Sequence, residues 1–192
     1  MSTNRLIILD RDGVINAESD QYIKNVDEWH PLPGSLEAVV QLKNAGYRVV
    51  LATNQSAIGR GLMSKHALYE IFCEMQRRLA QLGGAIDAMF YCPHHPDAHC
   101  RCRKPQPGML EQIARYYHVS LDGVPFVGDA SRDIDAARAA GAQPILVRTG
   151  RGSDNEALYS YSEAIPVFDN LAAFANAMAE NSPDGGDVRA RE

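Results

Sequence analysis

The sequence predicts an α/β fold with three layers, in which helices cover both faces of a mostly parallel central sheet. Short apolar runs alternate with amphipathic stretches along the chain, which is the pattern of strands joined by crossover helices. Polar residues also follow directly after these apolar runs, where parallel sheets bind their ligands. The 192 residues suit one domain, expected over 1–181, and the polar tail 182–192 is expected to be disordered.

Three strands are predicted in the first half of the chain, where short apolar runs end abruptly in polar residues: 5–10, 47–53 and 85–91. A helix is predicted over 34–46, with Ser35 as its N-cap and Gly46 as its left-handed stop. A second helix follows Ser64, its expected N-cap, and has a continuous apolar face. That face consists of Leu68, Ile71, Phe72, Met75, Leu79 and Leu82.

The second half of the chain continues the alternation of helices and strands. Helices are predicted over 108–118, 131–141 and 171–181, and strands over 124–129, 144–149 and 165–169. Because parallel strands present their carboxyl ends at one edge of the sheet, the polar residues that follow them should converge there. Those residues are Asp10, Asp12, Thr53, Asn54, Gln55, Cys92, His94, Asp129, Arg148 and Thr149.

The charge and hydropathy of the chain limit its partners. A net charge of −5 argues against non-specific binding to nucleic acid or to an anionic membrane. The apolar stretch Leu6–Leu9 ends at once in charged residues, and no run approaches the roughly 18 apolar residues of a membrane span. We therefore expect a cytoplasmic monomer that binds a small molecule, in a compartment that keeps thiols reduced.

Several carboxylates are expected at the ligand-binding edge of the sheet. Asp10 and Asp12 follow the first predicted strand, and Asp129 follows the fourth. Their mutual repulsion is tolerable beside a cation, and an oxygen-rich set of this kind suits Mg²⁺. Asp133 lies one helical turn further on, where it could join this site or simply cap the helix.

Donors for a phosphate group are expected beside these carboxylates. Thr53 offers a hydroxyl, and Asn54, Gln55 and Ser56 offer backbone N–H groups at a predicted turn. Lys104 lies shortly before the helix predicted over 108–118, where its ammonium group could neutralise phosphoryl charge. The sequence therefore predicts an anion site next to a metal site.

Cysteines and a histidine are grouped in a short segment after the third predicted strand: Cys92, His94, Cys100 and Cys102. In a reducing compartment such a group binds metal more often than it forms disulfides, and a closed Cys₃His set suits a structural zinc ion. His95 and His99 are alternative nitrogen donors. Zinc here would brace the loop that leads directly into Arg103 and Lys104.

Four motifs in this order resemble those of haloacid dehalogenase (HAD) superfamily phosphatases. They are LDRDGVIN (9–16), ATNQS (52–56), RKP (103–105) and VGDASRD (127–133). The resemblance covers residues 5 to about 150 and implies the Rossmann-like HAD fold, with a phosphatase active site at the carboxyl ends of the strands.

The resemblance also implies a role for each of the residues that match these motifs. Asp10 would be the nucleophile that forms an aspartyl-phosphate, and Asp12 the general acid and base. Asp12 must be protonated when the alcohol leaves, and we expect its closeness to Asp10 to favour holding one proton. Mg²⁺ would be held by the Asp10 side chain, the Asp12 backbone carbonyl and Asp129. Thr53 and Lys104 would stabilise the transferring phosphoryl group.

No cap domain is expected over the active site. The segment between Asp12 and the helix predicted at Ser35 is about twenty residues long, too short for an inserted domain. This capless plan with a zinc loop resembles the branch of the superfamily that dephosphorylates heptose bisphosphates and histidinol phosphate. It implies removal of the 7-phosphate of D-glycero-D-manno-heptose 1,7-bisphosphate, on the ADP-heptose route to the lipopolysaccharide core.

The open mouth of such a site would be formed by loops 14–33, 56–63 and 92–103. By resemblance the substrate contacts would be Arg11, Glu18, Ser19, Asp20, Gln21, Asn54, Gln55, Ser56 and Arg103. A sugar with two phosphates needs further donors at the mouth, and Arg60 and Arg101 are candidates beside Arg103. Hydrolysis of histidinol phosphate by the same residues is the nearest alternative. A receiver-like phosphoacceptor module is a more remote one, since it has no use for Asp12 as an acid and base.

Overall fold

A six-stranded sheet forms the centre of the protein in a computed structural model that describes residues 5–159 and 165–180. The strands are β1 (Leu6–Leu9), β2 (Arg48–Asn54), β3 (Ala88–Cys92), β4 (Pro125–Gly128), β5 (Gln143–Val147) and β6 (Val167–Phe168). Their spatial order is β3-β2-β1-β4-β5-β6, and every neighbouring pair is parallel. The predicted parallel sheet is confirmed, while the tail 182–192 lies outside the described residues.

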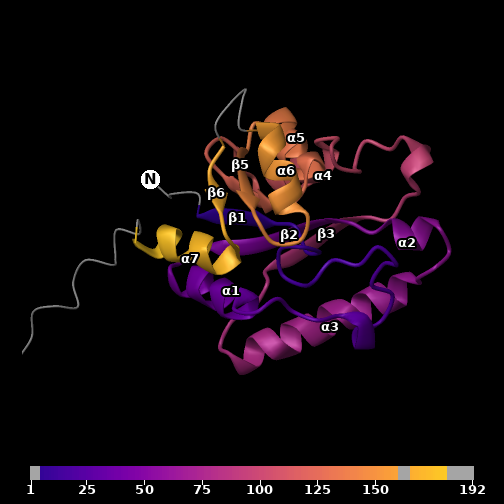
Figure 1. Ribbon diagram of the computed structural model, residues 1–192, viewed down its shortest axis with the longest axis horizontal. Helices are drawn as coiled ribbons and strands as arrows, with labels where there is room; N and C mark the ends of the chain where they lie inside the picture. The colour runs from indigo at the N-terminus through magenta and orange to yellow at the C-terminus, as the bar shows by residue number, and fades with distance from the viewer. Residues whose placement is uncertain (1–4, 160–164, 181–192) are drawn as a thin grey trace, which may run out of the picture.

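Helices cover both faces of this sheet (Figure 1). One face carries α1 (Ser35–Asn44), α3 (Lys65–Gln81) and α7 (Leu171–Glu180), and the other carries α4 (Gly108–Tyr117), α5 (Ser131–Ala140) and α6 (Gly152–Tyr159). Alternate residues of β1 point to opposite faces, so Ile7 and Leu9 pack in one apolar core and Leu6 and Ile8 in the other. The predicted three-layer α/β/α architecture is confirmed.

Two short helices escaped the sequence analysis. The helix α2 (Ser56–Gly59) occupies part of the mouth loop expected over 56–63, and α6 follows β5 directly. The helix α2 has four residues, too few to show a helical spacing of apolar residues, and α6 has no clear apolar face. The sequence pattern therefore gave no sign of a helix in either place. Two 3-10 turns, η1 (Val26–Glu28) and η2 (Pro96–Ala98), lie within the other two mouth loops.

The predicted caps of the first two helices have different outcomes. Ser35 is not the N-cap of α1; Gly34 is, with a left-handed φ of 75°. The Ser35 hydroxyl instead donates a 2.6 Å hydrogen bond to the carbonyl of Ile15, which ties the loop after β1 to the start of α1. Gly46 has the expected left-handed conformation, and the Ser64 side chain caps α3 by accepting from the N–H of Ala67.

No inserted domain covers the carboxyl ends of the strands in the parts of the chain that join β1 to α1 and β3 to α4. The first part contains η1 and the second contains η2 as its only helical turn. Among the described residues, no helix has the length and apolar character needed to cross a membrane.

Candidate active site

A pocket of about 240 Å³ opens at the carboxyl ends of the central strands. It is lined by Asp10, Asp12, Glu18, Ser19, Asp20, Tyr22, Ile23, Thr53, Asn54, Gln55, Ser56, Arg60, Pro96, Arg103, Arg132 and Arg151. The first carboxylates come from the end of β1, the hydroxyl and amides from the end of β2, and Arg132 from the start of α5. The expected convergence on one site is therefore confirmed for the residues at the ends of β1 and β2: Asp10, Asp12, Thr53, Asn54 and Gln55.

At the base of the pocket, Asp10 meets a fully buried lysine. The Nζ of Lys104 lies 2.9 Å from Asp10 Oδ2 and 2.6 Å from Asp133 Oδ1, and it donates a 2.8 Å hydrogen bond to the carbonyl of Ala52. Burial alone would lower the pKa of Lys104, but the charges of Asp10 and Asp133 outweigh burial and raise it. Lys104 is thus a permanent cation beneath Asp10.

Asp10, Asp129 and Asp133 form a buried acidic cluster, in which one oxygen of each side chain lies within 4.8 Å of the others. Burial, which outweighs the charge of Lys104, raises the pKa of Asp10 to about 6. Burial and the neighbouring charges of Asp10 and Asp133 raise the pKa of Asp129 to about 7. Asp129 Oδ1 is buried without a hydrogen-bond partner. A buried set of carboxylate oxygens with such an unpartnered atom fits a hard divalent cation such as Mg²⁺.

Glycines allow the chain to pass close to Asp129. Gly13 has φ +80° and Gly150 has φ +58°, and a Cβ at either position would lie 2.1 or 2.2 Å from Asp129 Oδ2. The N–H of Arg151 donates a 2.9 Å hydrogen bond to the same oxygen. The loops after β1 and β5 thereby fix one oxygen of Asp129 and leave the other free for a ligand.

Asp12 lies beside Asp10 but in a different environment. Its carboxylate accepts hydrogen bonds from Arg11, from Asn16 Nδ2 at 2.9 Å and from Gln55 Nε2 at 2.9 Å. Burial favours a raised pKa, but the charge of Arg11 and these hydrogen bonds outweigh it and lower the pKa of Asp12. The expectation that the closeness of Asp10 would keep a proton on Asp12 is therefore wrong for the ligand-free site, because the donors around Asp12 hold it as a carboxylate.

The residues at the end of β2 reach the pocket as expected. Thr53 is buried, and its hydroxyl accepts a 2.9 Å hydrogen bond from Gln55 Nε2. The Asn54 amide bonds both the N–H and the carbonyl of Lys104 at 3.1 Å, which places Lys104 below the pocket. Ser56 starts α2 at the wall of the pocket.

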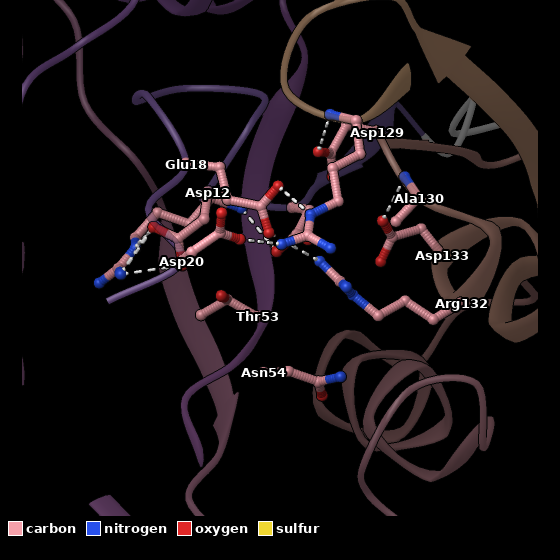
Figure 2. Close-up of polar contacts among 12 residues, drawn as sticks. Asp12, Glu18, Asp20, Thr53, Asn54, Asp129, Ala130, Arg132 and Asp133 are labelled. Atoms are coloured by element: carbon pink, nitrogen blue, oxygen red, sulfur yellow. Dashed lines mark hydrogen bonds and ion pairs between the residues drawn. The ribbon is translucent and has the colours of Figure 1, made fainter. Parts of the chain in front are cut away.

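Charged residues from two loops meet at the mouth (Figure 2). The guanidinium of Arg151 lies 2.8 Å from Glu18 and 2.6 Å from Asp20. Arg132 reaches from the start of α5 to within 3.7 Å of the same Glu18. These ion pairs join the loop after β1 to the segments that follow β4 and β5.

Three expected substrate contacts, and one polar residue expected at the strand ends, do not reach the pocket. Arg11 is 1% exposed and folds back into a two-pronged ion pair with Asp12, so it is not free to meet a ligand. Gln21 is exposed on the outer side of its turn, and the side chain of Arg101 is 89% exposed and lies near Glu111. Arg148 pairs with Glu156 and with Asp169 instead.

Two arginines of the pocket wall, Arg132 and Arg151, were missed in the sequence. Arg132 lies inside the VGDASRD motif. Arg151 lies two residues after Thr149, the last residue of the fifth predicted strand. Ligands bind just after strand ends, so including the two residues that follow this strand would have identified Arg151. Thr149 itself lies on this edge, where its hydroxyl donates a 2.7 Å hydrogen bond to the carbonyl of Gly13.

The cysteine loop forms a compact cluster beside the pocket. The Sγ atoms of Cys92, Cys100 and Cys102 lie 3.5 to 3.6 Å apart, and His94 Nδ1 lies 3.3 Å from Cys102 and 3.6 Å from Cys92. A tetrahedral ion with metal–sulfur distances of about 2.3 Å separates its sulfurs by about 3.8 Å, close to this spacing. His94, and not His95, whose Nδ1 accepts from the N–H of Asp97, completes the set.

Comparisons with known proteins agree with this site. Residues 101–174 match the family model described as HAD-hydrolase-like. The chain is 51% identical to a D-glycero-beta-D-manno-heptose-1,7-bisphosphate 7-phosphatase of Bordetella bronchiseptica, over 93% of this chain and 99% of that protein. A protein of the same name from Pseudomonas putida is 48% identical, over 91% and 99% of the two chains.

Solved structures give the same result. The crystal structure of the D,D-heptose 1,7-bisphosphate phosphatase from B. bronchiseptica, complexed with magnesium and phosphate, has a TM-score of 0.89 and 52% sequence identity, covering 92% of this chain and 98% of that one. The corresponding enzyme from Burkholderia thailandensis has a TM-score of 0.71 and 41% identity, covering 90% and 97%. The chain belongs to the family of D-glycero-beta-D-manno-heptose-1,7-bisphosphate 7-phosphatases, within the HAD-like hydrolases.

Proposed function

We propose that the protein hydrolyses the 7-phosphate of D-glycero-beta-D-manno-heptose 1,7-bisphosphate, in the biosynthesis of ADP-heptose. The observation that carries this proposal is the placing of Asp10 in a pocket wall, backed by the ammonium group of Lys104 and clustered with Asp129. The names of relatives at 48 to 51% identity supply the substrate and its anomer.

The reaction has two halves, in which Asp10 and Asp12 have separate roles. An oxygen of Asp10 attacks the phosphorus, the bond from phosphorus to the C7 oxygen breaks, and this oxygen takes a proton from Asp12 and leaves as the alcohol. Water then attacks the phosphorus of the aspartyl-phosphate and gives a proton to Asp12. The bond to Asp10 breaks, inorganic phosphate leaves, and the protein returns to its starting state.

The two carboxyl groups have environments that suit these roles. Asp12 rests as a carboxylate, the form that accepts the proton of water in the second half. A phosphate anion bound beside it raises its pKa and favours the protonated form that the first half needs. Lys104 and Thr53 lie next to Asp10 and to the pocket, where they offset the charge of the transferring group.

Magnesium fits the acidic cluster. The side chains of Asp10 and Asp129 and the backbone carbonyl of Asp12 would hold Mg²⁺, which offsets the repulsion between Asp10 and the phosphate dianion. The unpartnered Oδ1 of Asp129 supports this assignment. The lysine partner of Asp133 and its hydrogen bond from the N–H of Ala130 favour a positioning role for that residue.

A zinc ion fits the second cluster, formed by Cys92, His94, Cys100 and Cys102. With all four positions filled by protein ligands such an ion is structural, and it would hold the loop that leads into Arg103 and Lys104. The N–H of Gln55 donates a 2.8 Å hydrogen bond to the carbonyl of Cys92, so the same loop also touches the end of β2.

The pocket wall supplies contacts for the rest of the sugar. Glu18, Ser19 and Asp20 line one side and can accept hydrogen bonds from sugar hydroxyls. Arginines at the mouth provide cations for the second phosphate: Arg60, Arg103, Arg132 and Arg151. We propose that residues 1–181 form one domain that carries out this reaction as a monomer.

Phosphate release in the presence of Mg²⁺ tests the proposal. We expect kcat/KM for the heptose bisphosphate to exceed that for histidinol phosphate by at least about a hundredfold, because the second phosphate meets the arginines at the mouth. A preference for histidinol phosphate would contradict the proposed substrate. A long-lived phosphoprotein with slow turnover would contradict the proposed hydrolysis.

A further inference from the structure

A buried asparagine joins the general acid and base to a distant part of the loop above it. Asn16 is 0% exposed, and its Nδ2 donates one hydrogen bond to Asp12 Oδ1 and another to the carbonyl of Ala17, both at 2.9 Å. Its Oδ1 accepts a 3.0 Å hydrogen bond from Nε1 of Trp29, which is also 0% exposed. Every hydrogen of the Asn16 amide group, and its oxygen, thus has a partner.

These partners fix the orientation of the amide. The indole N–H of Trp29 can only donate, so Oδ1 of Asn16 must face it. Turning the amide over would place its oxygen against Asp12 Oδ1 and the carbonyl of Ala17, and its NH₂ group against the indole N–H. Because the site is buried, the flipped amide would leave polar atoms without hydrogen-bond partners on both sides, which is energetically costly.

Asn16 is therefore a fixed donor to one oxygen of Asp12. Oδ1 of Asp12 receives Asn16 and Arg11, whereas Oδ2 receives Arg11 and Gln55, and Gln55 lines the pocket. With Oδ1 held in place, the carboxylate cannot rotate, and Oδ2 remains as the oxygen beside the pocket.

The same contact links Asp12 to the loop that shapes the mouth. Asn16 and Trp29 lie at the two ends of segment 17–28, which contributes Glu18, Ser19 and Asp20 to the pocket wall. The N–H of Ala17 also donates a 2.9 Å hydrogen bond to the carbonyl of His30, so the two ends of the segment are tied together. Movement at either end would change the aim of Asp12.

We propose that Asn16, anchored by Trp29, is a positioning residue that aims Asp12 Oδ2 at the oxygen of the leaving alcohol. The proposal rests on the phosphatase function proposed above, in which the bond from phosphorus to the C7 oxygen breaks as Asp12 gives its proton to that oxygen. An alkoxide needs this proton in order to leave, whereas 4-nitrophenolate is stable without it.

The dependence of the rate on the leaving group tests the proposal. Asn16→Asp keeps an acceptor for Trp29 but removes the donor to Asp12, and Trp29→Phe keeps an aromatic ring but frees the amide of Asn16. We expect kcat/KM for the heptose bisphosphate to fall by roughly tenfold to a hundredfold in Asn16→Asp, and by roughly fivefold to tenfold in Trp29→Phe. For 4-nitrophenyl phosphate, we expect either variant to lose less than about threefold.

Ser35→Ala is the matched control, because it removes the buried hydrogen bond that the Ser35 hydroxyl donates to the carbonyl of Ile15, next to Asn16, without touching Asp12. It should leave the ratio of the two kcat/KM values unchanged. Equal losses on both substrates in Asn16→Asp and Trp29→Phe would overturn the proposal and leave Asn16 a purely structural role. A wild-type protein inactive on the bisphosphate would instead count against the proposed substrate, and histidinol phosphate would then serve as the alkyl ester.

A spectroscopic signal gives an independent readout, since Trp29 is the single tryptophan of the sequence. We expect Asp12→Asn to shift the ¹H–¹⁵N resonance of the Trp29 indole, because Asn16 connects the two residues. The shift should be lost when Asp12→Asn is made in the Asn16→Ala background. An indole resonance that does not respond to Asp12→Asn in the wild-type background would contradict the connection.

Discussion

The ammonium nitrogen of Lys104 lies 2.9 Å from Oδ2 of Asp10, and both side chains are almost completely buried. Lys104 Nζ also lies 2.6 Å from Oδ1 of Asp133. For a buried lysine between two carboxylates, the electrostatic attraction to them matters more than the packing of its side chain. Lys104 therefore joins the end of β1 to the start of α5, and it lies directly beside the nucleophile.

Replacing this lysine should damage both stability and activity. Lys104→Met leaves Asp10 and Asp133 buried without their cation, and we expect the free energy of unfolding to fall by about 3 kcal/mol. Denaturant unfolding measures this change. Lys43→Met is the control, because Lys43 forms a part-exposed ion pair with Asp87 and should cost less than about 1 kcal/mol. Equal costs for the two variants would contradict the role of Lys104.

Glycine substitutions should separate backbone strain from metal binding. Gly150→Ala places a Cβ against Asp129 Oδ2, whereas Gly123→Ala has the same left-handed strain at φ +70° with open space around it. We expect Gly123→Ala to lose about 1 kcal/mol of stability from backbone strain, and Gly150→Ala to lose more, because its Cβ would also lie 2.7 Å from the Cα of Gly13. Only Gly150→Ala should raise the Mg²⁺ concentration needed for half-maximal activity, by roughly tenfold or more. An unchanged Mg²⁺ requirement in Gly150→Ala would show that Asp129 is not a ligand.

Stabilisation by Mg²⁺ should depend on pH. Without metal, the pKa of Asp10 is raised to about 6 and that of Asp129 to about 7, so these two groups bind more protons in the folded protein than in the unfolded chain between about pH 4 and pH 7. The stability of the metal-free protein should fall as pH rises across this window. Mg²⁺ displaces these protons and should raise Tm more at about pH 8 than at about pH 5.5. Thermal unfolding with and without Mg²⁺ measures this, and an equal rise at both pH values would contradict it.

Removal of the second metal should reduce activity at a distance. Cys102→Ser takes one ligand from the cluster, and we expect it to lower the zinc content from about one ion per chain and to lower kcat, because the loop leads into Lys104. Elemental analysis and kinetics measure the two effects. Cys73→Ser, at an exposed position far along α3, should change neither. A wild-type protein purified without chelator that contains no zinc would refute the assignment.

The sequence was a good guide wherever its signal was periodic or lay at the end of a strand. Apolar runs located the strands, and the polar residues after them located Asp10 and Thr53 in the pocket and Asp129 in the acidic cluster beside Asp10. The sequence also offered Lys104 as a cation for a phosphate, and the motif resemblance supported that role, but no local pattern could reveal its burial beneath Asp10. Long-range contacts of this kind depend on the packing of segments that are far apart in the sequence.

The failures also have physical reasons. Arg11 is next to Asp10 in the sequence and carries a charge that suits a phosphate, yet its buried guanidinium folds back into an ion pair with the part-exposed Asp12. Whether Asp12 holds a proton depends on its hydrogen-bond partners, and the spacing of residues in the sequence does not show these partners. Arg132 and Arg151 were missed because an arginine alone is more often a solvated surface residue.

The Asp10→Asn variant tests the central claim most directly. The amide keeps the shape of Asp10 but cannot attack phosphorus, so we expect no release of inorganic phosphate from the heptose bisphosphate in the presence of Mg²⁺, while circular dichroism still reports the wild-type fold. Hydrolysis by Asp10→Asn at a rate close to that of the wild type would contradict the account.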